Sequence, residues 1–223
     1  MRRLSLVMLF LPVCAWANFT ISPMNQTISP KTKTISYTLE NKAASRTAFE
    51  ISTYHRLLDD EGREFTEPAK ELRPFPARVI LEPGQTKRIK LMYLGKRSLN
   101  SEVAYRVNFL QSDKDVDASE LSGVKAKYQF VTALYVSPEK AMPSLNVTAR
   151  QDEQLHLTLS NSGTKHKILQ NWGLSLTDSS GQQHQYSHRL PDVNVLAGSH
   201  FTLTLPASSL DSGSLQAELT QQQ

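Results

Sequence analysis

The chain has 223 residues and a near balance of charge, with 25 basic and 21 acidic side chains and a net charge of +4. This balance excludes bulk-charge binding of a polyanion such as nucleic acid, although a local basic cluster could still bind one carboxylate. The length is sufficient for two domains of ordinary size once a short leader is removed.

The first 17 residues have the pattern of a secretory signal peptide. Two arginines follow the first methionine, residues 4–13 form an apolar run, and residues 15–17 place small side chains two positions apart, as signal peptidase requires. The apolar run is too short to span a bilayer, which takes ~20 residues. We expect cleavage after Ala17, and the mature chain would then carry 23 basic against 21 acidic residues, a net charge of +2. No later segment is long and apolar enough for a membrane helix, so we expect no membrane insertion.

Cys14 is the only cysteine, and it lies within the predicted leader. The mature protein would therefore enter an oxidising compartment without a disulfide, a thiol nucleophile or a cysteine metal ligand, and its hydrophobic cores alone would hold it together. The alternative interpretation is a lipoprotein that carries its lipid on Cys14. Val13 argues against that alternative, because a lipidated cysteine usually follows a small residue.

From residue 34 onward, the sequence alternates apolar and polar side chains with the period of two expected for β-strands. In the first such run, Ile35, Tyr37 and Leu39 share one face. Further runs of this kind are residues 48–54, 87–93, 104–110, 124–136, 155–159, 174–177 and 201–205. Turn sequences separate them at intervals of about ten residues, and no amphipathic helix of three turns is present. The pattern predicts an all-β protein built of antiparallel β-sandwiches.

Two prolines, Pro138 and Pro143, interrupt the pattern, and proline disrupts strand pairing and stiffens a connection. We therefore predict three parts: a signal peptide over residues 1–17, a first sandwich over residues 18–140 and a second sandwich over residues 141–223. A faint internal repeat supports two related sandwiches. Residues 79–86 and residues 193–200 each combine an apolar run, a glycine turn and the start of an alternating strand.

A set of motifs in fixed order is more specific than any of these patterns. They are residues 19–23, residues 81–84 leading into residues 88–91, residues 102–107, residues 135–138, residues 159–163 and residues 196–198. Their order and spacing resemble those of the periplasmic chaperones of the chaperone–usher pilus pathway, most clearly in the first sandwich. The resemblance implies two immunoglobulin-like sandwiches in tandem, joined in an L shape, in a periplasmic protein that is not an enzyme and has no cofactor. It also implies that the chain binds pilus subunits and delivers them to an outer-membrane usher.

The resemblance further implies a donated strand. A pilus subunit is a sandwich that lacks its final strand, and the chaperone completes it by β-augmentation. Four apolar residues share one face of the expected donor strand: Val124, Ala126, Tyr128 and Phe130. Each of them, buried in a subunit, would contribute ~1.5–3 kcal/mol. An exposed apolar edge of this kind also favours a self-capping homodimer of the free protein.

The alternating pattern alone leaves a second interpretation of this segment open, namely that it is the last core strand of the first sandwich. The preceding residues 112–120 are polar and charged. Such a segment is typical of a loop that lets the strand extend on binding, and it favours the donor interpretation.

Chaperones of this family grip the C-terminal carboxylate of the subunit with a basic pair in the cleft between the sandwiches. In the best-known branch, the pair is an arginine in the first strand and a lysine late in the donor strand. The aligned positions here, Asn25 (or Gln26) and Ala133 (or Thr132), are uncharged. This departure resembles the divergent or alternate branches of the family.

Those branches have an arginine in a stretch like residues 105–107, so Arg106 is the leading candidate for the carboxylate anchor. Arg88 and Lys127 are weaker candidates. A guanidinium group suits this role because its planar fork matches a carboxylate. The alternative is an ordinary solvated arginine on a strand, the commoner state of a charged side chain.

The family also holds the angle between its two sandwiches with a charged bridge. The positions that align with this bridge are Lys90, Glu102 and Asp211. The expected arrangement is a basic side chain that links an acid of the first sandwich to an acid of the second. The alternative is a set of ordinary exposed ion pairs, worth ~0–1 kcal/mol each.

We predict no catalytic residue and no metal site. His184 and His188 have a spacing that binds metal on a helix, but they lie in a polar stretch between predicted strands. The chain has no nucleophile elbow and no glycine-rich phosphate loop. Two other classes stay open: a secreted structural pilin or adhesin of similar sandwiches, and a secreted metal-dependent hydrolase. The lack of a cysteine in the mature chain favours the chaperone over a pilin or adhesin, since many of those carry a disulfide.

Overall fold

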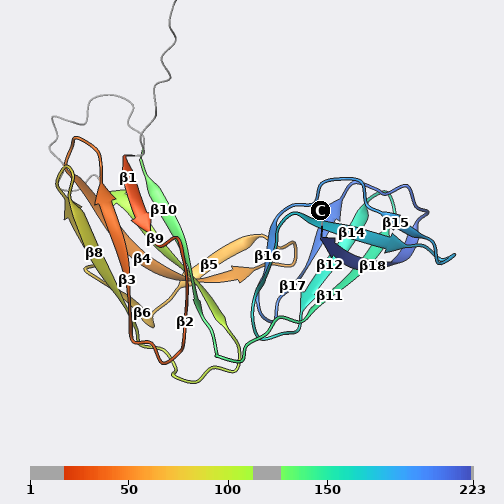
Figure 1. Ribbon diagram of the computed structural model, residues 1–223, viewed down its shortest axis with the longest axis horizontal. Helices are drawn as coiled ribbons and strands as arrows, with labels where there is room; N and C mark the ends of the chain where they lie inside the picture. The colour runs from red at the N-terminus through yellow and green to blue at the C-terminus, as the bar shows by residue number, and fades with distance from the viewer. Residues whose placement is uncertain (1–17, 113–126, 222–223) are drawn as a thin grey trace, which may run out of the picture.

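The computed structural model describes residues 18–112 and 127–221, and within these ranges every regular element is a β-strand. The predicted signal peptide, residues 1–17, lies outside the described residues. The strands divide into two sandwiches, one formed by β1 to β10 and the other by β11 to β18 (Figure 1). The prediction of an all-β protein is therefore confirmed.

The first sandwich has two sheets, which we name the β8 sheet and the β10 sheet. The β8 sheet has the strand order β1-β3-β8-β6, and the β10 sheet has the order β2-β10-β9-β4-β5, with β7 paired to β4. The strands are β1 (Phe19–Ser22), β2 (Asn25–Ile28), β3 (Thr34–Asn41), β4 (Thr47–Leu58), β5 (Glu64–Pro68), β6 (Leu72–Phe75), β7 (Arg78–Leu81), β8 (Thr86–Tyr93), β9 (Val103–Ser112) and β10 (Gln129–Val136). Neighbouring strands are antiparallel except β2 and β10, which run parallel.

The second sandwich has a six-stranded sheet in the order β15-β14-β18-β11-β12-β17 and a two-stranded ribbon of β13 and β16. The strands are β11 (Leu145–Gln151), β12 (Leu155–Asn161), β13 (Lys167–Leu169), β14 (Trp172–Thr177), β15 (Gln183–Gln185), β16 (Val193–Val195), β17 (His200–Leu205) and β18 (Gly213–Gln221). Residues 137–144 connect β10 to β11. They contain the predicted boundary after Lys140, whose position stays a prediction.

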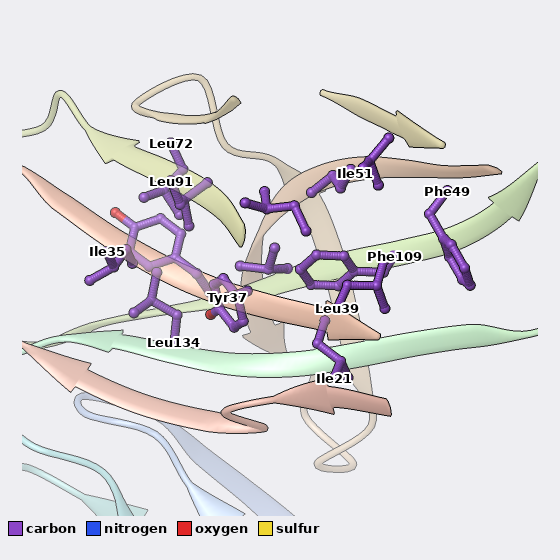
Figure 2. Packing of buried hydrophobic residues seen from close by; sticks show 14 of the residues in the cluster. Ile21, Ile35, Tyr37, Leu39, Phe49, Ile51, Leu72, Leu91, Phe109 and Leu134 are labelled. Carbon is purple, nitrogen blue, oxygen red and sulfur yellow. The ribbon is translucent and has the colours of Figure 1, made fainter. Parts of the chain in front are cut away.

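The core of the first sandwich lies between its two sheets, because alternate side chains of each strand face inward. Tyr37 and Leu39 of β3 pack there with Phe109 of β9 and Leu134 of β10, and all four are fully buried (Figure 2). The rings of Tyr37 and Phe109 meet edge to face, with centroids 5.4 Å apart. Burial of one such side chain contributes ~1.5–3 kcal/mol. This core is therefore the main stabilising feature of a sandwich whose described residues include no cysteine.

A buried asparagine at the end of β3 recurs at the end of β12. Each of the two, Asn41 and Asn161, donates from its side-chain amide to the carbonyl four residues later in the chain. The backbone carbonyl of each asparagine accepts a hydrogen bond from the glycine of a later turn, Gly84 at 2.8 Å and Gly198 at 2.9 Å. The same device therefore secures the turn before β8 and the turn before β17. It gives the internal repeat in the sequence a structural meaning.

The two sandwiches meet at an angle, and β5 extends from the first sandwich toward the second (Figure 1). A small apolar cluster forms their contact; its members are Ala104, Ala133 and Tyr135 of the first sandwich, Leu196 of the second, and Leu58 at the end of β4. A cavity of about 340 Å³ lies beside this cluster and is lined by residues of both sandwiches. Arg56, on the outer face of the β10 sheet, lines this cavity together with residues 196–200 of the second sandwich. We call the cavity and the adjoining outer face of the β10 sheet the cleft.

Candidate functional site: the edge of β10 and the adjoining cleft

Strand β10 is paired along its whole length on one side and only partly on the other. β9 pairs with residues 129–136, whereas β2 pairs only with residues 133–136. Among the described strands, none pairs with residues 129–132 on the β2 side. This part of β10, which we name the β10 edge, is therefore a free sheet edge.

Hydrogen bonds at its two ends show how the backbone of the β10 edge is oriented. The carbonyl of Tyr128 accepts from Gln111 N–H on the β9 side, at 2.9 Å. Ala133 N–H donates to the opposite side, to the residue before β2, also at 2.9 Å. Because backbone groups alternate between the two sides of a strand, Gln129 and Val131 direct their N–H and C=O groups away from β9. These groups are available to another strand.

Two of the four predicted donor side chains, Val124 and Ala126, lie outside the described residues. Of the other two, Tyr128 immediately precedes β10 and Phe130 is its second residue, and both are half-buried against the first core. Their rings contact aromatic side chains of that core at centroid distances of 5.0 and 6.3 Å. In the free chain, these two rings therefore pack within its own sandwich, which is what the core-strand interpretation expects. Val131, on the opposite face of β10, is exposed.

The positions aligned with the basic pair of the family lie in one row across the outer face of the β10 sheet. Asn25 pairs with Ala133, Ala133 with Arg106, and Arg106 with Tyr54. Arg106, on β9, therefore lies one strand away from Ala133 and two strands away from Asn25. Tyr54, which the sequence did not single out, lies on the far side of Arg106.

Arg106 shares the carboxylate of Glu64 with a second arginine, Arg56. Arg106 donates from Nε to Glu64 Oε1 at 2.7 Å and from Nη2 to Oε2 at 2.5 Å. Arg56 donates from Nε to Glu64 Oε2 at 2.7 Å and from Nη1 to the Tyr135 hydroxyl at 3.1 Å. Burial alone would raise the pKa of Glu64, but its contacts with Arg106 and Arg56 hold that pKa below its usual value. Glu64 in turn raises the pKa of Arg106. Because arginine stays protonated in proteins, the two arginines and the ionised Glu64 have a formal net charge of +1.

The other two anchor candidates lie elsewhere. Arg88 is exposed on β8, in the opposite sheet, where it pairs with Thr38. Lys127 is exposed just before the start of β10, outside the row that contains Arg106. The structure therefore brings neither of them to Arg106.

Glu102 links the two sandwiches through a histidine. Its Oε1 accepts from the backbone N–H of His166 at 3.1 Å and lies 2.5 Å from His166 Nδ1. The Tyr135 ring stacks on the His166 ring, with centroids 3.9 Å apart. The Glu102 side chain is only 1% exposed. Burial alone would raise its pKa, but the hydrogen bonds from His166 bring the pKa below its usual value.

The structure does not bring the other two residues of the predicted bridge to this contact. Lys90 is exposed on the outer face of the β8 sheet, and Asp211 is exposed in the turn before β18. Within the described ranges, neither forms an ion pair with Glu102, whose side-chain partner is the imidazole of His166. Of the predicted bridge Lys90–Glu102–Asp211, only Glu102 lies at the contact between the sandwiches.

The tip of the β4–β5 hairpin makes a second contact between the sandwiches. The Asp60 carbonyl accepts from Thr202 N–H at 2.9 Å, and Leu58 packs against the second core. Gly62 has a φ of +76°, and a Cβ at this position would lie 2.6 Å from Cδ2 of Phe201. Glycine is therefore needed here for its backbone conformation and for the space beside it.

Sequence reasoning missed four residues of the cleft: Arg56, Glu64, Tyr135 and His166. The Glu64–Arg106 pair spans 42 positions in the chain, and no local pattern shows such a pairing. Arg56 and Glu64 are eight positions apart, on either side of the turn at Gly62. Opposite charges flanking a glycine turn are the one signal that could have revealed this part of the cluster.

The described residues contain no group of three or more His, Cys, Asp or Glu side chains placed to share a metal ion. His184 lies 3.3 Å from a carboxylate oxygen of Asp178, and His188 packs beside Tyr186. In the same part of the chain, no helix has the length and apolar character needed to cross a membrane.

Solved structures share this fold over nearly the whole chain. A chain of the CsuC–CsuE chaperone–tip adhesion subunit complex, from the archaic chaperone–usher Csu pili of Acinetobacter baumannii, is 17% identical with a TM-score of 0.65, and the match covers 87% of this chain and 90% of that one. The class 5 fimbriae chaperone CfaA is 16% identical with a TM-score of 0.60, over 91% and 99% of the two chains. The E. coli chaperone DraB is 14% identical with a TM-score of 0.56, over 92% and 97%.

No protein-family model and no curated protein sequence matches the chain. At the identities above, the structural likeness establishes the fold: two immunoglobulin-like sandwiches in tandem, as in the fimbrial chaperones. The resemblance expected from the motifs is thus confirmed at the level of fold.

Proposed function

We propose that this chain is a periplasmic chaperone that binds a pilus subunit by strand addition at the β10 edge and delivers it to an outer-membrane usher. The observation that carries the proposal is the free β10 edge, with the Arg56–Arg106 pair on the outer face of the same sheet. The fold shared with the chaperones CfaA and DraB supports it. The structurally similar chain from Csu pili comes from a complex of a chaperone with a tip adhesion subunit, which supports a subunit as the partner.

The proposed chemistry is hydrogen bonding and burial, without a catalytic step. Gln129 and Val131 each offer an N–H and a C=O, and each backbone hydrogen bond formed contributes a net ~0.5–1.5 kcal/mol. Tyr128 and Phe130 lie on the inner face of the strand, so a subunit bound here would continue the chain's own core. Val124 and Ala126 precede Tyr128 by four and two positions, so in a continuous strand they would belong to the same proposed donor face. A subunit gains from this pairing because its unfinished sheet would otherwise aggregate.

The two arginines of the cleft support a carboxylate-binding role. Arg56 and Arg106 bring two guanidinium groups to one place, and among the described residues they share one carboxylate, that of Glu64. A guanidinium fork binds a carboxylate at two points, and it binds more strongly where water is partly excluded. We propose that Arg106 holds the C-terminal carboxylate of the subunit, with Arg56 beside it. This contact would set the register of the added strand.

The substitution Val131→Pro tests strand addition at the β10 edge. Proline removes an N–H that points away from β9, so the strand loses no hydrogen bond of its own sheet. We expect the variant to stay folded and to fail to recover a pilus subunit from the same operon on co-expression, whereas the wild-type chain forms a soluble one-to-one complex. Recovery is measured by co-purification and size-exclusion chromatography.

Val131→Ala is the matched control, because it shortens the side chain and keeps the N–H. It is expected to recover the subunit at close to the wild-type level. Undiminished recovery by a folded Val131→Pro variant would contradict strand addition at this edge. Polymerisation of the purified wild-type chain by itself would instead favour a structural pilin or adhesin.

The outer face of the β8 sheet is the surface that we propose for the usher. Arg73, Arg88 and Lys90 lie on it with the exposed side chains of Phe75 and Met92. This face belongs to the sheet opposite β10, so it stays accessible when the β10 edge holds a subunit. The double charge reversal of Arg88 and Lys90 to glutamate should weaken usher binding and leave subunit recovery unchanged. Loss of both activities would contradict separate surfaces.

The free protein is proposed to form a self-capping homodimer through the same β10 edge. An unpaired strand edge readily pairs with a second copy. Sedimentation of the wild-type chain at increasing concentration should show a dimer, and the Val131→Pro variant should remain monomeric. If the wild-type chain and the Val131→Pro variant formed the same fraction of dimer, the dimer contact would lie outside the β10 edge.

A further inference from the structure

Two guanidinium groups in the cleft are largely removed from water and share one internal carboxylate. The Arg56 and Arg106 side chains are 10% and 19% exposed, and that of Glu64 is 31% exposed. Unpaired guanidinium groups in such a place would carry a large desolvation penalty. Glu64 therefore has a clear role in the free chain, because it balances one of the two charges.

The hydrogen bonds of the cluster show which donors Glu64 occupies. Arg106 presents its Nε and Nη2 edge to the two oxygens of Glu64, which is the two-point arrangement preferred by carboxylates. Arg56 adds Nε to the same carboxylate and gives Nη1 to the Tyr135 hydroxyl. A second carboxylate that approached Arg106 by this edge would need the position that Glu64 holds.

Glu64 lies on an edge strand of the β10 sheet, which can shift away from the two arginines more easily than an inner strand can. It is the first residue of β5, which pairs only with β4 and forms the edge of the β10 sheet. All five residues of β5 are exposed, and the strand extends away from the rest of its sheet (Figure 1). Arg106 lies on β9 and is paired on both sides, with Ala133 and Tyr54. Arg56 lies on β4, which is the longest strand of the sheet and pairs with β9 up to the residue before Arg56. The acid can therefore move with less disruption than the two bases.

We propose that Glu64 is an internal placeholder carboxylate, which occupies the Arg56–Arg106 pair in the free chain and is replaced there by the terminal carboxylate of a bound partner. The inference rests on the proposed function, because the partner is the subunit, and it concerns the regulation of the same site. A placeholder keeps the two guanidinium groups paired and correctly placed before binding. It also lowers the affinity for free carboxylates, because each of them must displace Glu64.

The competing explanation of the same contacts is that Glu64 is a structural brace for the two arginines. The placeholder and the brace predict opposite changes in carboxylate affinity when Glu64 is removed. If Glu64 only holds the arginines in position, its removal loosens them and weakens carboxylate binding. If Glu64 competes for them, its removal strengthens carboxylate binding. Affinity for a small carboxylate therefore separates the two explanations, and it does not depend on strand addition.

The test is a titration of the chain with N-acetyl-trialanine as the free acid and as the C-terminal amide, followed by the ¹⁵N signal of Arg106 Nε. In the Glu64→Gln variant, we expect the free acid to bind with a Kd about ten-fold lower than in the wild-type chain. The amide should shift the signal in neither chain. Glu67→Gln removes an equal charge from the same strand at an exposed position that contacts neither arginine, and it should leave the wild-type Kd unchanged.

Glu64→Asp provides a second variant in case Glu64→Gln unfolds. It keeps the charge on a shorter side chain, so its Kd for the free acid should lie between those of the wild-type chain and the Glu64→Gln variant. Equal or weaker binding of the free acid by a folded Glu64→Gln or Glu64→Asp variant would overturn the placeholder. The placeholder would also be overturned if the Arg106 Nε signal of the wild-type chain did not shift at the highest concentration of the free acid. None of these results bears on the β10 edge, which the Val131 variants test separately.

Discussion

The two buried asparagines illustrate how single side chains hold each sandwich together. Asn41 and Asn161 are fully buried, and each uses its amide to satisfy backbone groups of a turn and of a neighbouring strand. A buried backbone carbonyl that loses its partner costs more than an ordinary hydrogen bond is worth. These residues are therefore structural and lie away from the cleft.

Replacement of Asn161 by alanine should destabilise the second sandwich. The change leaves the carbonyls of Lys165 and Val195 without their donor, so we expect a loss of about 1–3 kcal/mol in the free energy of unfolding. Urea denaturation followed by tryptophan fluorescence measures this loss, since Trp172 lies in the second core. Asn146→Ala, at an exposed position of β11, is the control and should change stability little. Equal stability of the two variants would show that the amide contacts are unimportant.

The β4–β5 hairpin is the element that the sequence described least well. The alternating pattern predicted residues 48–54, but β4 continues to Leu58 and is followed by β5. Every residue of β5 is exposed, so no buried face imposes the period of two by which strands are recognised. The hairpin nevertheless supplies Arg56 and Glu64 to the cleft and its tip to the second sandwich.

Gly62→Ala should separate the hairpin tip from the second sandwich. The positive φ makes alanine unfavourable by about 1–2 kcal/mol, and the new Cβ would clash with the ring of Phe201. We expect a larger loss of stability than the φ alone explains, together with an increased radius of gyration in small-angle X-ray scattering.

Gly84→Ala is matched to this variant because Gly84 has a φ of +72° and open space where its Cβ would be. In Gly84→Ala, the free energy of unfolding should fall only by the cost of the positive φ, and the radius of gyration should stay that of the wild-type chain. Two variants with the same stability and the same radius of gyration would mean that the hairpin tip does not fix the second sandwich.

The aromatic rings at the start of β10 affect how the donor face is tested. Tyr128 and Phe130 pack against the first core in the free chain, so aspartate at either position would disturb the chaperone as well as any complex. The backbone of Val131 offers a cleaner test, because its outward N–H belongs to no pairing within the described sheets.

At the scale of the whole molecule, the contact of Glu102 with His166 is one of those that join the two sandwiches. The pKa of Glu102 is lowered below the usual value of 4.5. A carboxyl group with a lowered pKa in the folded state stabilises that state fully above its unfolded pKa. This contribution disappears as the pH falls through the lower pKa of the folded state.

We therefore expect the contact between the sandwiches to be complete above about pH 4.5 and to weaken as the pH falls below it. Thermal unfolding between pH 3 and pH 7 should show the Tm of the wild-type chain falling on acidification more than that of Glu102→Gln, in which this position does not titrate. The radius of gyration should rise over the same interval in the wild-type chain. Parallel pH profiles of the two chains would exclude Glu102 as the titrating group.

Local patterns in the sequence were enough for the architecture. The period of two at residues 34–39 and 155–159 predicted β3 and β12, because a half-buried strand must alternate its side chains. The repeated glycine turn at Gly84 and Gly198 indicated two related sandwiches, and the order of motifs indicated the fold of the fimbrial chaperones. These features depend on residues close together in the chain, and that is why they can be read without a structure.

Contacts between distant residues were decided only by the tertiary structure. Arg106 stood out in the sequence, but its partners Glu64 and Arg56 and the histidine that faces Glu102 became apparent only when four strands and a second sandwich were brought together. The free side of β10 likewise follows from how far β2 runs beside it. Strand pairing and ion pairing join residues far apart in the chain, so no local pattern specifies them.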